Sequence, residues 1–389
     1  MSGTIFMNKL MEGVSVEWTT LGDEFFLEVA NAARRPVKAS LRVSGMVPYY
    51  GANNIQDYVD GHTHDGEYVL IAEDGSASPE NYSVQYATGK FWANNHVHVV
   101  RGKEGLNTRF LYHYLCAVDF IPYLPNKDRS KLTKGEMIKI PLPIPCPDNP
   151  KKSLEIQAEI ARILDTFTEL TAELTGELTA RKQQYEYYRD ALLSFGDRAE
   201  ERTTITTLGE IFNMRAGRNI SASNISSVPS GRRIYPCFGG NGVRGFVEDF
   251  SHDDKHVLIG RQGALCGNVQ RVQGKFFATE HAVVVKANGE VNLDWAYHLL
   301  THINLNQYAS KSAQPGLAVG TLAKVKVAVP PIKVQIRIAG ILDRFDKLTS
   351  SMSEGLPREI ELRQKQFAYY RDRLFSFPMP DTANTATVA

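Results

Sequence analysis

The sequence contains few cysteines and lacks the segments that would place it in a membrane. It has four cysteines and no Cys-x-x-Cys pair: Cys116, Cys146, Cys237 and Cys266. Spacing of this kind favours reduced thiols over disulfides or a metal site. No apolar run approaches the roughly 18 residues that a membrane span needs, and the first ten residues lack a signal peptide's long apolar stretch. We therefore expect a cytoplasmic protein.

Two catalytic motifs are also missing. A methyltransferase that acts on adenine holds the base with an Asn/Asp-Pro-Pro-aromatic loop. The nearest segment here, VPPI at Val329 to Ile332, has neither the polar first residue nor the aromatic last one. The phosphate-binding motif GxxxxGK[ST] of ATP-driven motors does not occur. The chain is therefore not expected to carry out either chemistry.

What the sequence does contain is an internal repeat. The segment IARILDTFTEL at Ile160 to Leu170 returns as IAGILDRFDKL at Ile338 to Leu348. The segment at Arg181 to Phe195 likewise returns at Arg363 to Phe377. A period of about 180 residues is too long for a solenoid. With 389 residues, the chain fits two copies of one unit, each a globular domain followed by a helix.

The repeat continues outside the helices. WTTLGD at Trp18 to Asp23 returns as ITTLGE at Ile205 to Glu210. GKFWANNHVHVV at Gly89 to Val100 returns as GKFFATEHAVVV at Gly274 to Val285. Coiled-coil composition alone does not produce such matches. The segments between the matching blocks differ, and we expect them to carry whatever each copy recognises by itself.

The net charge of +1 hides an uneven distribution. Residues 1 to 155 carry 16 Lys and Arg against 18 Asp and Glu, whereas residues 197 to 333 carry 16 against 11. The second globular half is therefore the better candidate for binding a polyanion. Charge alone does not establish that it binds one.

Two segments have the apolar periodicity of a coiled coil, with steps of three and four residues. The first seam comprises Ile160, Ile163, Phe167, Leu170, Leu174 and Leu178, and its last step is a stutter. The second seam comprises Ile338, Ile341, Phe345, Leu348 and Met352. Gly355-Leu356-Pro357 follows the second seam. Because proline removes a helical hydrogen bond, we expect a kink or break there.

Such seams are common in oligomers, which is one interpretation of both. The alternative is pairing within the chain, which the high effective concentration of two linked seams favours. With a globular domain leading into each helix, an antiparallel pair is the simplest arrangement. The segment TELTAELTGELT at Thr168 to Thr179 consists of four-residue units. Each unit added or removed would change the helix by about one turn, so helix length is expected to matter for function.

At these residues the chain resembles the specificity subunits of type I restriction-modification systems, and within them the type IC group. The resemblance covers nearly the whole chain. The ILDTF and ILDRF helix starts and the TAEL-like units contribute to it. It is also carried by IPLPIPCPDNP (Ile140 to Pro150), VAVPPI (Val327 to Ile332), GLPREIELRQKQ (Gly355 to Gln366) and the YYRD boxes at Tyr187 to Asp190 and Tyr369 to Asp372.

The resemblance implies an α+β fold. Two α/β target-recognition domains would be separated by two long helices packed as an antiparallel intramolecular coiled coil, with pseudo-twofold internal repetition. Each domain would read one half of a bipartite, asymmetric DNA site, and the coil would set the spacer. Two modification subunits would methylate adenine with S-adenosylmethionine, and two restriction subunits would use ATP and Mg²⁺. The chain itself would be non-catalytic and bind no cofactor.

The repeat and the resemblance together divide the chain into five segments. We expect recognition domain 1 over residues 1 to 153 and recognition domain 2 over residues 197 to 332. The central helical region is expected over residues 154 to 196 and the C-terminal one over residues 333 to 378. The polar tail, residues 379 to 389, is expected to be disordered.

Candidate DNA contacts follow from the chemistry of base reading. Arginine pairs with guanine and Asn or Gln with adenine, while other Lys and Arg hold phosphates. The candidates in domain 1 are Arg34, Arg35, Lys38, Asn53, Asn54, Gln56 and Lys90. Those in domain 2 are Arg215, Arg218, Arg232, Arg233, Asn241, Arg244, Arg261, Gln262, Asn268 and Lys275. For any one of them the alternative is an ordinary surface charge, and the target bases do not follow from the sequence.

Two further patterns resemble ligand-binding motifs but have simpler structural explanations. GNGVRG at Gly240 to Gly245 matches the dinucleotide fingerprint GxGxxG but no helical pattern follows it, so we expect a turn or a DNA-facing loop. His62 and His64, and His96 and His98, alternate as metal ligands on a strand would, but no third ligand is evident. We expect His96 to lie on a β-strand at the end of the domain core.

Two other function classes stay open at this point. The first is a self-contained DNA-modifying enzyme, against which the missing Pro-Pro loop argues. The second is a coiled-coil scaffold without a DNA role, which would bind partners but shift no DNA. Binding of S-adenosylmethionine by the purified chain would distinguish the first, and absence of DNA binding by the assembled complex the second.

Overall fold

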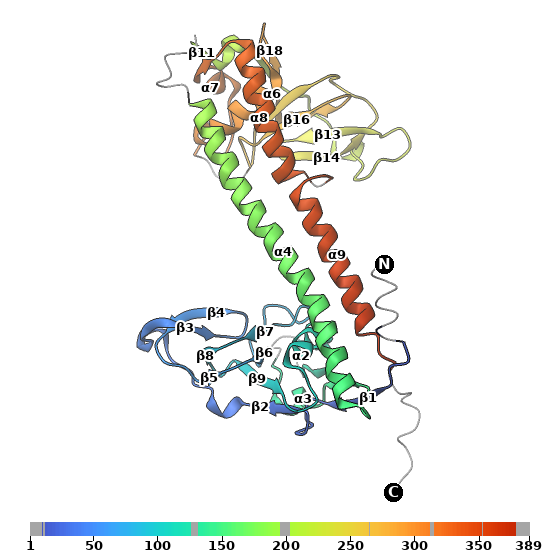
Figure 1. The fold of residues 1–389 in the computed structure, drawn as a ribbon. Coiled ribbons are helices and arrows are strands. Elements are labelled where there is room, and N and C mark those ends of the chain that lie inside the picture. Colours follow the sequence, from blue (N-terminus) through green and yellow to red (C-terminus); the bar gives the residue numbers. More distant parts are fainter. Residues whose placement is uncertain are drawn as a thin grey trace. The chain divides into compact units, whose positions relative to one another are not determined.

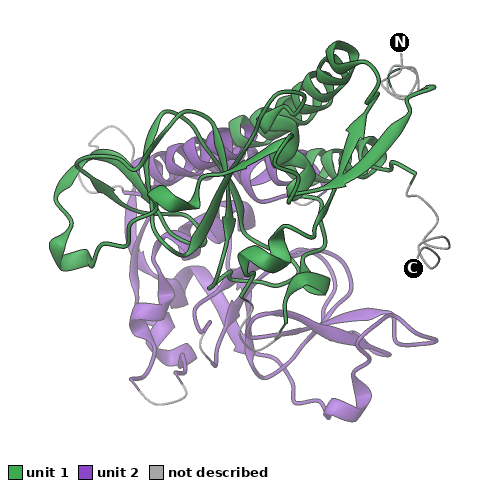
Figure 2. Cartoon of the chain, turned by 90° about the horizontal axis from the view of Figure 1, so that it is seen from below, with its two compact units in different colours: residues 1–173, 360–389 green, residues 174–359 purple. Residues whose placement is uncertain are grey.

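The computed structural model describes residues 10, 12–125, 131–194, 203–263, 265–311, 315–351 and 353–378. The expected seam residue Met352 and the expected disordered tail lie outside these residues. The chain forms two compact units, drawn in different colours in Figure 2. Unit 1 comprises Met1–Glu173 with Ile360–Ala389, and unit 2 comprises Leu174–Glu359. Each unit holds one globular domain and part of both helical regions.

The globular domain of unit 1, domain 1, is built on two four-stranded sheets and one two-stranded sheet. The first sheet has the order β2-β9-β6-β7, with β2 Leu27–Val29, β9 Val97–Gly102, β6 Tyr68–Ala72 and β7 Val84–Ala87. The second has the order β4-β3-β8-β5, with β4 Ile55–Val59, β3 Ser44–Tyr50, β8 Lys90–Ala93 and β5 His64–Asp65. Strand β6 is buried along its whole length, as its continuous apolar run YVLIA predicts.

A short antiparallel pair and two helices complete domain 1. The pair is β1 (Val16–Thr20) with β10 (Pro141–Pro145). Helix α2 (Thr108–Leu115) begins where the side chain of Asn107 accepts a hydrogen bond from the Phe110 backbone N–H, a common N-cap. Helix α3 (Lys134–Met137) begins after Thr133, which caps it in the same way. Three 3-10 turns lie at Asn31–Ala33 (η1), Ala39–Leu41 (η2) and Ile121–Tyr123 (η3).

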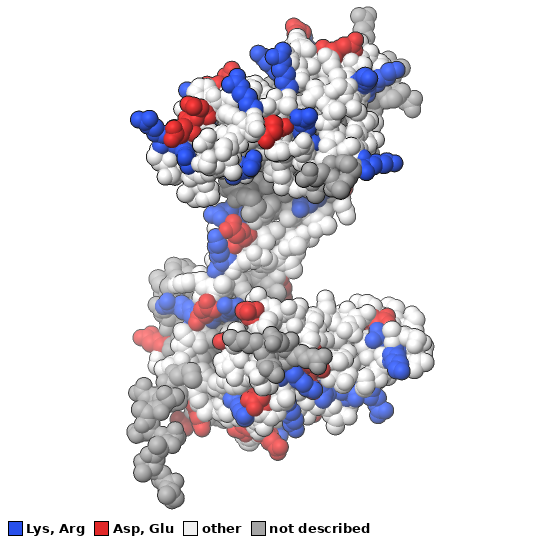
Figure 3. Space-filling model, turned by 180° about the vertical axis from the view of Figure 1, so that it is seen from behind, with Lys and Arg blue, Asp and Glu red and all other residues white. Residues whose placement is uncertain are grey.

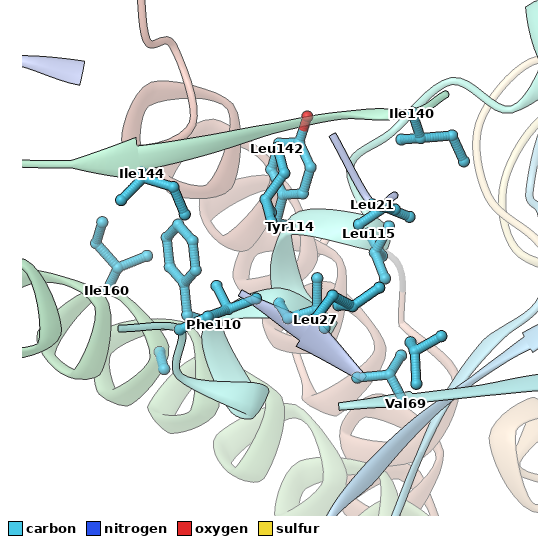
Figure 4. Close-up of a cluster of buried hydrophobic side chains, with 14 of the residues drawn as sticks. Leu21, Leu27, Val69, Phe110, Tyr114, Leu115, Ile140, Leu142, Ile144 and Ile160 are labelled. Carbon is cyan, nitrogen blue, oxygen red and sulfur yellow. The ribbon is translucent and has the colours of Figure 1, made fainter. Parts of the chain in front are cut away.

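The core of domain 1 joins the sheet, α2 and the long helix α4 (Pro150–Leu193). Figure 4 shows Phe110 of α2, Ile144 of β10 and Ile160 of α4 within one cluster of buried side chains. All three are at most 2% exposed. Burying a side chain of this size contributes roughly 2 kcal/mol. The first part of α4 is therefore held firmly on domain 1.

The globular domain of unit 2, domain 2, repeats this plan. Its first sheet has the order β12-β18-β15-β16, with β12 Phe212–Ala216, β18 Ala282–Ala287, β15 His256–Gly260 and β16 Val269–Val272. Its second sheet has the order β14-β13-β17, with β14 Gly242–Val247, β13 Tyr235–Gly239 and β17 Phe277–Ala278. The remaining elements are β11 (Thr204–Thr207) paired with β19 (Lys326–Val329), α5 (Leu208–Ile211), α6 (Leu293–His302), α7 (Val319–Ala323), η4 (Ala222–Asn224) and η5 (Leu305–Tyr308).

The two helical regions pair within each unit (Figure 1). In unit 1, Phe167 of α4 stacks on Tyr370 of α9 (Leu356–Leu374) at 5.1 Å between ring centroids. In unit 2, Tyr188 of α4 stacks on Phe345 of α8 (Ile332–Ser350) at 5.6 Å.

The direction of pairing follows from the cores. The start of α4 shares its core with the end of α9, at Leu374, and the end of α4, at Leu193, shares its core with the start of α8. The expected antiparallel intramolecular pairing is therefore confirmed within each unit. The expected break is confirmed as well, because α8 ends at Ser350 and α9 begins at Leu356, with Gly355 at φ +107°.

One seam residue was assigned wrongly. Ile341 is 36% exposed, whereas its neighbour Leu342 is fully buried. The same shift occurs in the first copy, where Leu164 is fully buried and Ile163 only partly. The reason is that this part of each helix also packs on its own domain, as α8 does on α6. The buried stripe is thus wider than an a/d seam. No helix among the described residues is long and apolar enough to cross a membrane.

Candidate nucleic-acid interface

The GNGVRG segment forms a tight β-hairpin in domain 2. Strands β13 and β14 are joined by Gly240 and Asn241, and Gly242 has φ +103°. No helix follows β13, so the phosphate-binding strand-turn-helix of a dinucleotide site is absent here. The segment is a turn, as its sequence context predicts.

This hairpin borders a hollow of about 490 Å³. The other walls are the loop after β15, at Gln262 and Gly263, and the turn before β18, at His281. The three segments touch through backbone: a Cβ on Gly240 would lie 3.0 Å from the Gln262 carbonyl oxygen and 3.1 Å from that of His281. Glycine at this position therefore allows the hairpin to sit on the two loops.

Three predicted DNA-contact residues line the hollow: Asn241, Arg244 and Gln262. None of the three side chains makes a hydrogen bond or an ion pair with another described residue, and all three residues are exposed. Amide and guanidinium groups in this state offer their donors and acceptors to a ligand. Arg and Gln are also the side chains that pair bidentately with guanine and adenine edges.

Most other arginines of domain 2 also lack a carboxylate partner in the part of the chain that the structure describes. Among the described residues, only Arg271 of this domain is in an ion pair. The arginines without a carboxylate partner are Arg215, Arg218, Arg232, Arg233, Arg244 and Arg261. On the face drawn in Figure 3, Lys and Arg of this unit alternate with Asp and Glu. The face shown therefore has separate basic side chains, not one continuous basic patch.

In domain 1 two predicted contacts, Arg34 and Asn53, are already used inside the domain. Arg34 donates to Glu73 and to the Val97 carbonyl oxygen, both at 2.7 Å, and its side chain is 18% exposed. We therefore withdraw Arg34 from the expected DNA contacts. The Asn53 side chain donates to the Gly75 carbonyl oxygen and accepts from the Ala77 N–H, which ties the β3–β4 hairpin to the next loop.

The remaining candidates are exposed and stay predictions. Asn54 accepts a hydrogen bond only from the neighbouring Ile55 N–H. Lys275 lies over the Phe250 ring, 4.6 Å from its centre. The other exposed candidates, with no side-chain hydrogen bond or ion pair to a described residue, are Arg35, Lys38, Gln56, Lys90 and Asn268.

His64 and its counterpart His252 have structural partners. His64 stacks on Phe91 at 5.0 Å while Thr63 hydrogen-bonds its Nδ1, and His252 repeats this arrangement on Phe276 with Ser251. Burial lowers the pKa of both rings. No group of three or more His, Cys, Asp or Glu among the described residues is placed to hold a metal ion. His96 lies in the turn before β9 and pairs with Asp74, so its expected place on a strand was wrong.

Each domain is anchored to its helix by two polar contacts that were not predicted from the sequence. The first is made by a glutamine of the helix. Gln157 of α4 accepts from the Asn107 N–H at the start of α2, and Gln335 of α8 accepts from the Asn292 N–H at the start of α6. The second anchor is a histidine–aspartate pair.

In unit 1 the pair is His113 with Asp165 at 2.7 Å, and in unit 2 it is His298 with Asp343 at 2.8 Å. Burial lowers the pKa of both histidines, although the aspartate opposes the shift. For Asp165, burial raises the pKa, but hydrogen bonds from Arg109 and His113 outweigh it and leave the pKa below its usual value. The domain and the helix in each unit are therefore joined as one body.

Comparison with known proteins identifies the family. A family model described as the type I restriction modification DNA specificity domain matches residues 15–181 and again residues 200–362. The chain belongs to this family of specificity subunits. Its two matches cover most of the chain and correspond to the two copies of the repeat.

Relatives support the same assignment over the whole length. A putative type I restriction enzyme specificity subunit of Haemophilus influenzae is 43% identical over 96% of this chain and 98% of its own. The specificity subunit of the EcoprrI type I restriction enzyme of Escherichia coli is 46% identical over 91% and 93%. A crystal structure of the S subunit of a type I restriction-modification system from M. genitalium has the same fold, with a TM-score of 0.69 at 17% identity, covering 96% of this chain and 99% of that one.

The family assignment settles the main alternatives. A type I specificity subunit recognises DNA and is itself non-catalytic, so neither the self-contained modifying enzyme nor the scaffold without a DNA role is favoured. The YYRD boxes of this specificity subunit have the same local geometry in both units: Tyr187 is 69% and Tyr369 is 53% exposed, and each adjoins an Arg–Asp ion pair.

Proposed function

We propose that this specificity subunit reads a bipartite, asymmetric DNA site, with one half assigned to each domain. The observation that carries the proposal is the repeated hairpin with its two adjoining loops. The framework is the same in both domains, but the exposed bulge residue on it differs, Gln56 in domain 1 against Arg244 in domain 2. Different side chains select different bases, so the two halves would not be a palindrome.

The length of α4 would set the spacer between the two half-sites. This helix runs without interruption from Pro150 to Leu193, and each unit anchors its own part of the helical regions. A four-residue unit adds about 6 Å to a helix. A change of that size in α4 would alter which spacer allows both domains to bind at once.

The chain would act as the adaptor for its partners. Two modification subunits would bind S-adenosylmethionine and methylate adenine, and two restriction subunits would bind ATP and Mg²⁺. The matching YYRD boxes support two equivalent docking positions, since Tyr187 and Tyr369 present similar exposed rings. A protein that reads cellular DNA in this way would work in the cytoplasm.

The test is methylome sequencing in a host that lacks other methyltransferases. The host would express this chain with its own modification subunit, either unchanged or with the four residues Thr171 to Leu174 deleted. We expect one bipartite N6-methyladenine motif from the unchanged chain. The deletion should shorten its spacer or abolish methylation at the original spacing.

Two results would count against the proposal. Unchanged spacing in the deletion variant, at full activity, would mean that α4 does not determine the spacer. Absence of any motif, despite a stable complex with the modification subunit, would contradict site recognition itself. An insertion that duplicates Thr171 to Leu174 is the matched control, because it should lengthen the spacer by the same amount.

A further inference from the structure

The two hairpins correspond residue by residue and share a β-bulge. In domain 1, Tyr49 pairs with Asp57 and Tyr50 pairs with Ile55, so Gln56 has no partner across the strand. In domain 2, Cys237 pairs with Gly245 and Phe238 with Val243, so Arg244 is skipped in the same way. Bulges of this kind redirect a side chain and are frequent next to functional sites. Gln56 and Arg244 are therefore equivalent, specially placed residues.

A glycine lies beside each of the two redirected side chains. A Cβ on Gly51 would lie 2.0 Å from the Gln56 amide nitrogen, and a Cβ on Gly239 would lie 3.4 Å from Cδ of Arg244. Both side chains thus lie over the backbone of their own hairpin. Neither makes a side-chain hydrogen bond or ion pair with a described residue, so their donors are free while their stems are positioned.

The loops beside the two hairpins are held by the same backbone hydrogen bonds. In domain 1 the Glu73 N–H donates to the His96 carbonyl oxygen, and in domain 2 the Arg261 N–H donates to that of His281. The Glu73 and Arg261 carbonyl oxygens accept from Leu132 and Leu317. The backbone of the loop beside the bulge residue is therefore held alike in the two domains. What changes is the chemistry of the bulge residue, an amide in one copy and a guanidinium in the other.

We propose that the bulge residue is a base-reading residue of each domain, with Gln56 contacting an adenine and Arg244 a guanine. A glutamine amide pairs bidentately with the N6 and N7 edge of adenine, and an arginine with O6 and N7 of guanine. In domain 2, Asn241 and Gln262 in the same hollow supply further contacts beside Arg244. This inference rests on the proposed function, because it assigns one position within each half-site.

Substitutions at Arg244 separate base reading from phosphate binding. Lysine keeps the charge but lacks the planar fork, so Arg244→Lys should retain phosphate contacts and lose bidentate pairing. We expect R244K to reduce the guanine preference at one position of one half-site roughly five- to a hundredfold and R244Q to shift that position toward adenine, while the other half stays unchanged. Lys286→Gln is the matched control, because it removes an exposed positive charge at the other end of β18 and should leave the motif intact.

The reciprocal substitution is in domain 1. Gln56→Ala should loosen an adenine position in the other half-site only. The readout is the methylome of each variant expressed with its modification subunit, so that the complete assembly is tested. Both residues are exposed and without partners among the described residues, so folding should be preserved. Recovery of the complex with the modification subunit checks this.

Each outcome decides the inference. An unchanged motif in R244Q would overturn it for domain 2, and an unchanged motif in Q56A would overturn it for domain 1. If a variant gives no methylation, its base preference is measured by competition binding instead. DNA duplexes that differ at one base pair then compete for the purified complex. Loss of discrimination at one base pair supports the inference, and uniform weakening at all positions overturns it. If the wild-type chain gives no methylation motif, the proposed function itself fails.

Discussion

The two domains share a framework and use their arginines in opposite ways. Of the five arginines described in domain 1, four are in ion pairs: Arg34, Arg42, Arg101 and Arg109. Of the seven described in domain 2, only Arg271 is. The excess positive charge of domain 2 is therefore carried largely by arginines that have no carboxylate partner among the described residues. The comparison teaches that net charge and available charge have to be judged separately, because pairing inside a domain removes a cation from use.

The contacts that anchor each domain to its helix also use arginine differently in the two units. In unit 1 the arginine comes from α2, where Arg109 meets Asp165 and lies 4.3 Å from the centre of the Tyr86 ring. In unit 2 it comes from the strand, where Arg271 meets Asp343 and Asp346 and lies 4.2 Å from the centre of the Tyr297 ring. Asp294 of α6 is a third carboxylate partner of Arg271. The arginine therefore comes from a different element in each unit, but in both units it pairs with an aspartate of the anchored helix and lies over a tyrosine ring.

The largest expected difference between the units concerns these anchors. Asp165→Ala leaves both Arg109 and His113 without their carboxylate, whereas Asp343→Ala leaves only His298 without one, because Arg271 keeps Asp294 and Asp346. Because an unpaired buried charge is costly, we expect losses of about 3 kcal/mol and about 1 kcal/mol in the free energy of unfolding. Urea denaturation of the two variants measures both values. Equal losses would contradict the distinction.

The next largest single loss of stability is expected between the two helical regions. Gly355 separates α8 from α9 at φ +107°, and a Cβ there would lie 2.6 Å from the Lys347 carbonyl oxygen. Gly355→Ala should therefore destabilise the chain by about 2 kcal/mol. Gly176→Ala, in the interior of α4 with open space around it, should stabilise it by about 0.7 kcal/mol. Thermal unfolding of the pair gives opposite shifts if the break is built into the fold, and shifts of one sign would argue against it.

Acid sensitivity is expected to differ between the units, with unit 1 losing more stability as the pH falls. Burial lowers the pKa of His64, His98 and His113 in unit 1, and of His252 and His298 in unit 2. A histidine whose folded pKa is depressed contributes stability that is complete above its ordinary pKa of 6.5. That contribution is lost as the pH falls below this value, because the unfolded chain then binds the proton first.

His98 gives a direct test, since the matching position in domain 2 is Val283. His98→Val removes hydrogen bonds to Asn31 and to the Leu132 carbonyl oxygen, so it should destabilise domain 1 at every pH. The loss relative to wild type should be smaller at about pH 5.5 than at about pH 7.5. Pulse proteolysis at both pH values measures this difference. A loss independent of pH would show that His98 does not titrate on unfolding.

The smallest expected effect is in the salt dependence of DNA binding. Arg232→Gln removes an unpaired cation of domain 2, and should lower the slope of log affinity against log salt by about 1. Arg101→Gln removes a cation that Glu28 already neutralises in domain 1, and should leave the slope unchanged. Fluorescence anisotropy with the assembled complex and labelled DNA compares the two. A larger change for Arg101 would reverse the assignment of free charge.

The large features of the fold follow from local sequence. The seams predicted paired helices because apolar spacing reports which face a helix buries, and Gly355-Leu356-Pro357 predicted the break. The spacing did not predict the burial of Leu164 and Leu342, which are buried because the helix also packs on its domain. Heptad spacing contains no information about that second surface, so Ile341 was placed in the seam.

The sequence alone determined the duplication, the family and the set of polar side chains from which DNA contacts are drawn. Only the tertiary structure decided which of those side chains are free. Arg34 and Glu73 are far apart in the chain and meet through the sheet, while Arg244 is released by a bulge that is defined by its partner strand. Pairing and bulges arise between segments distant in sequence, and for that reason a single segment does not reveal them.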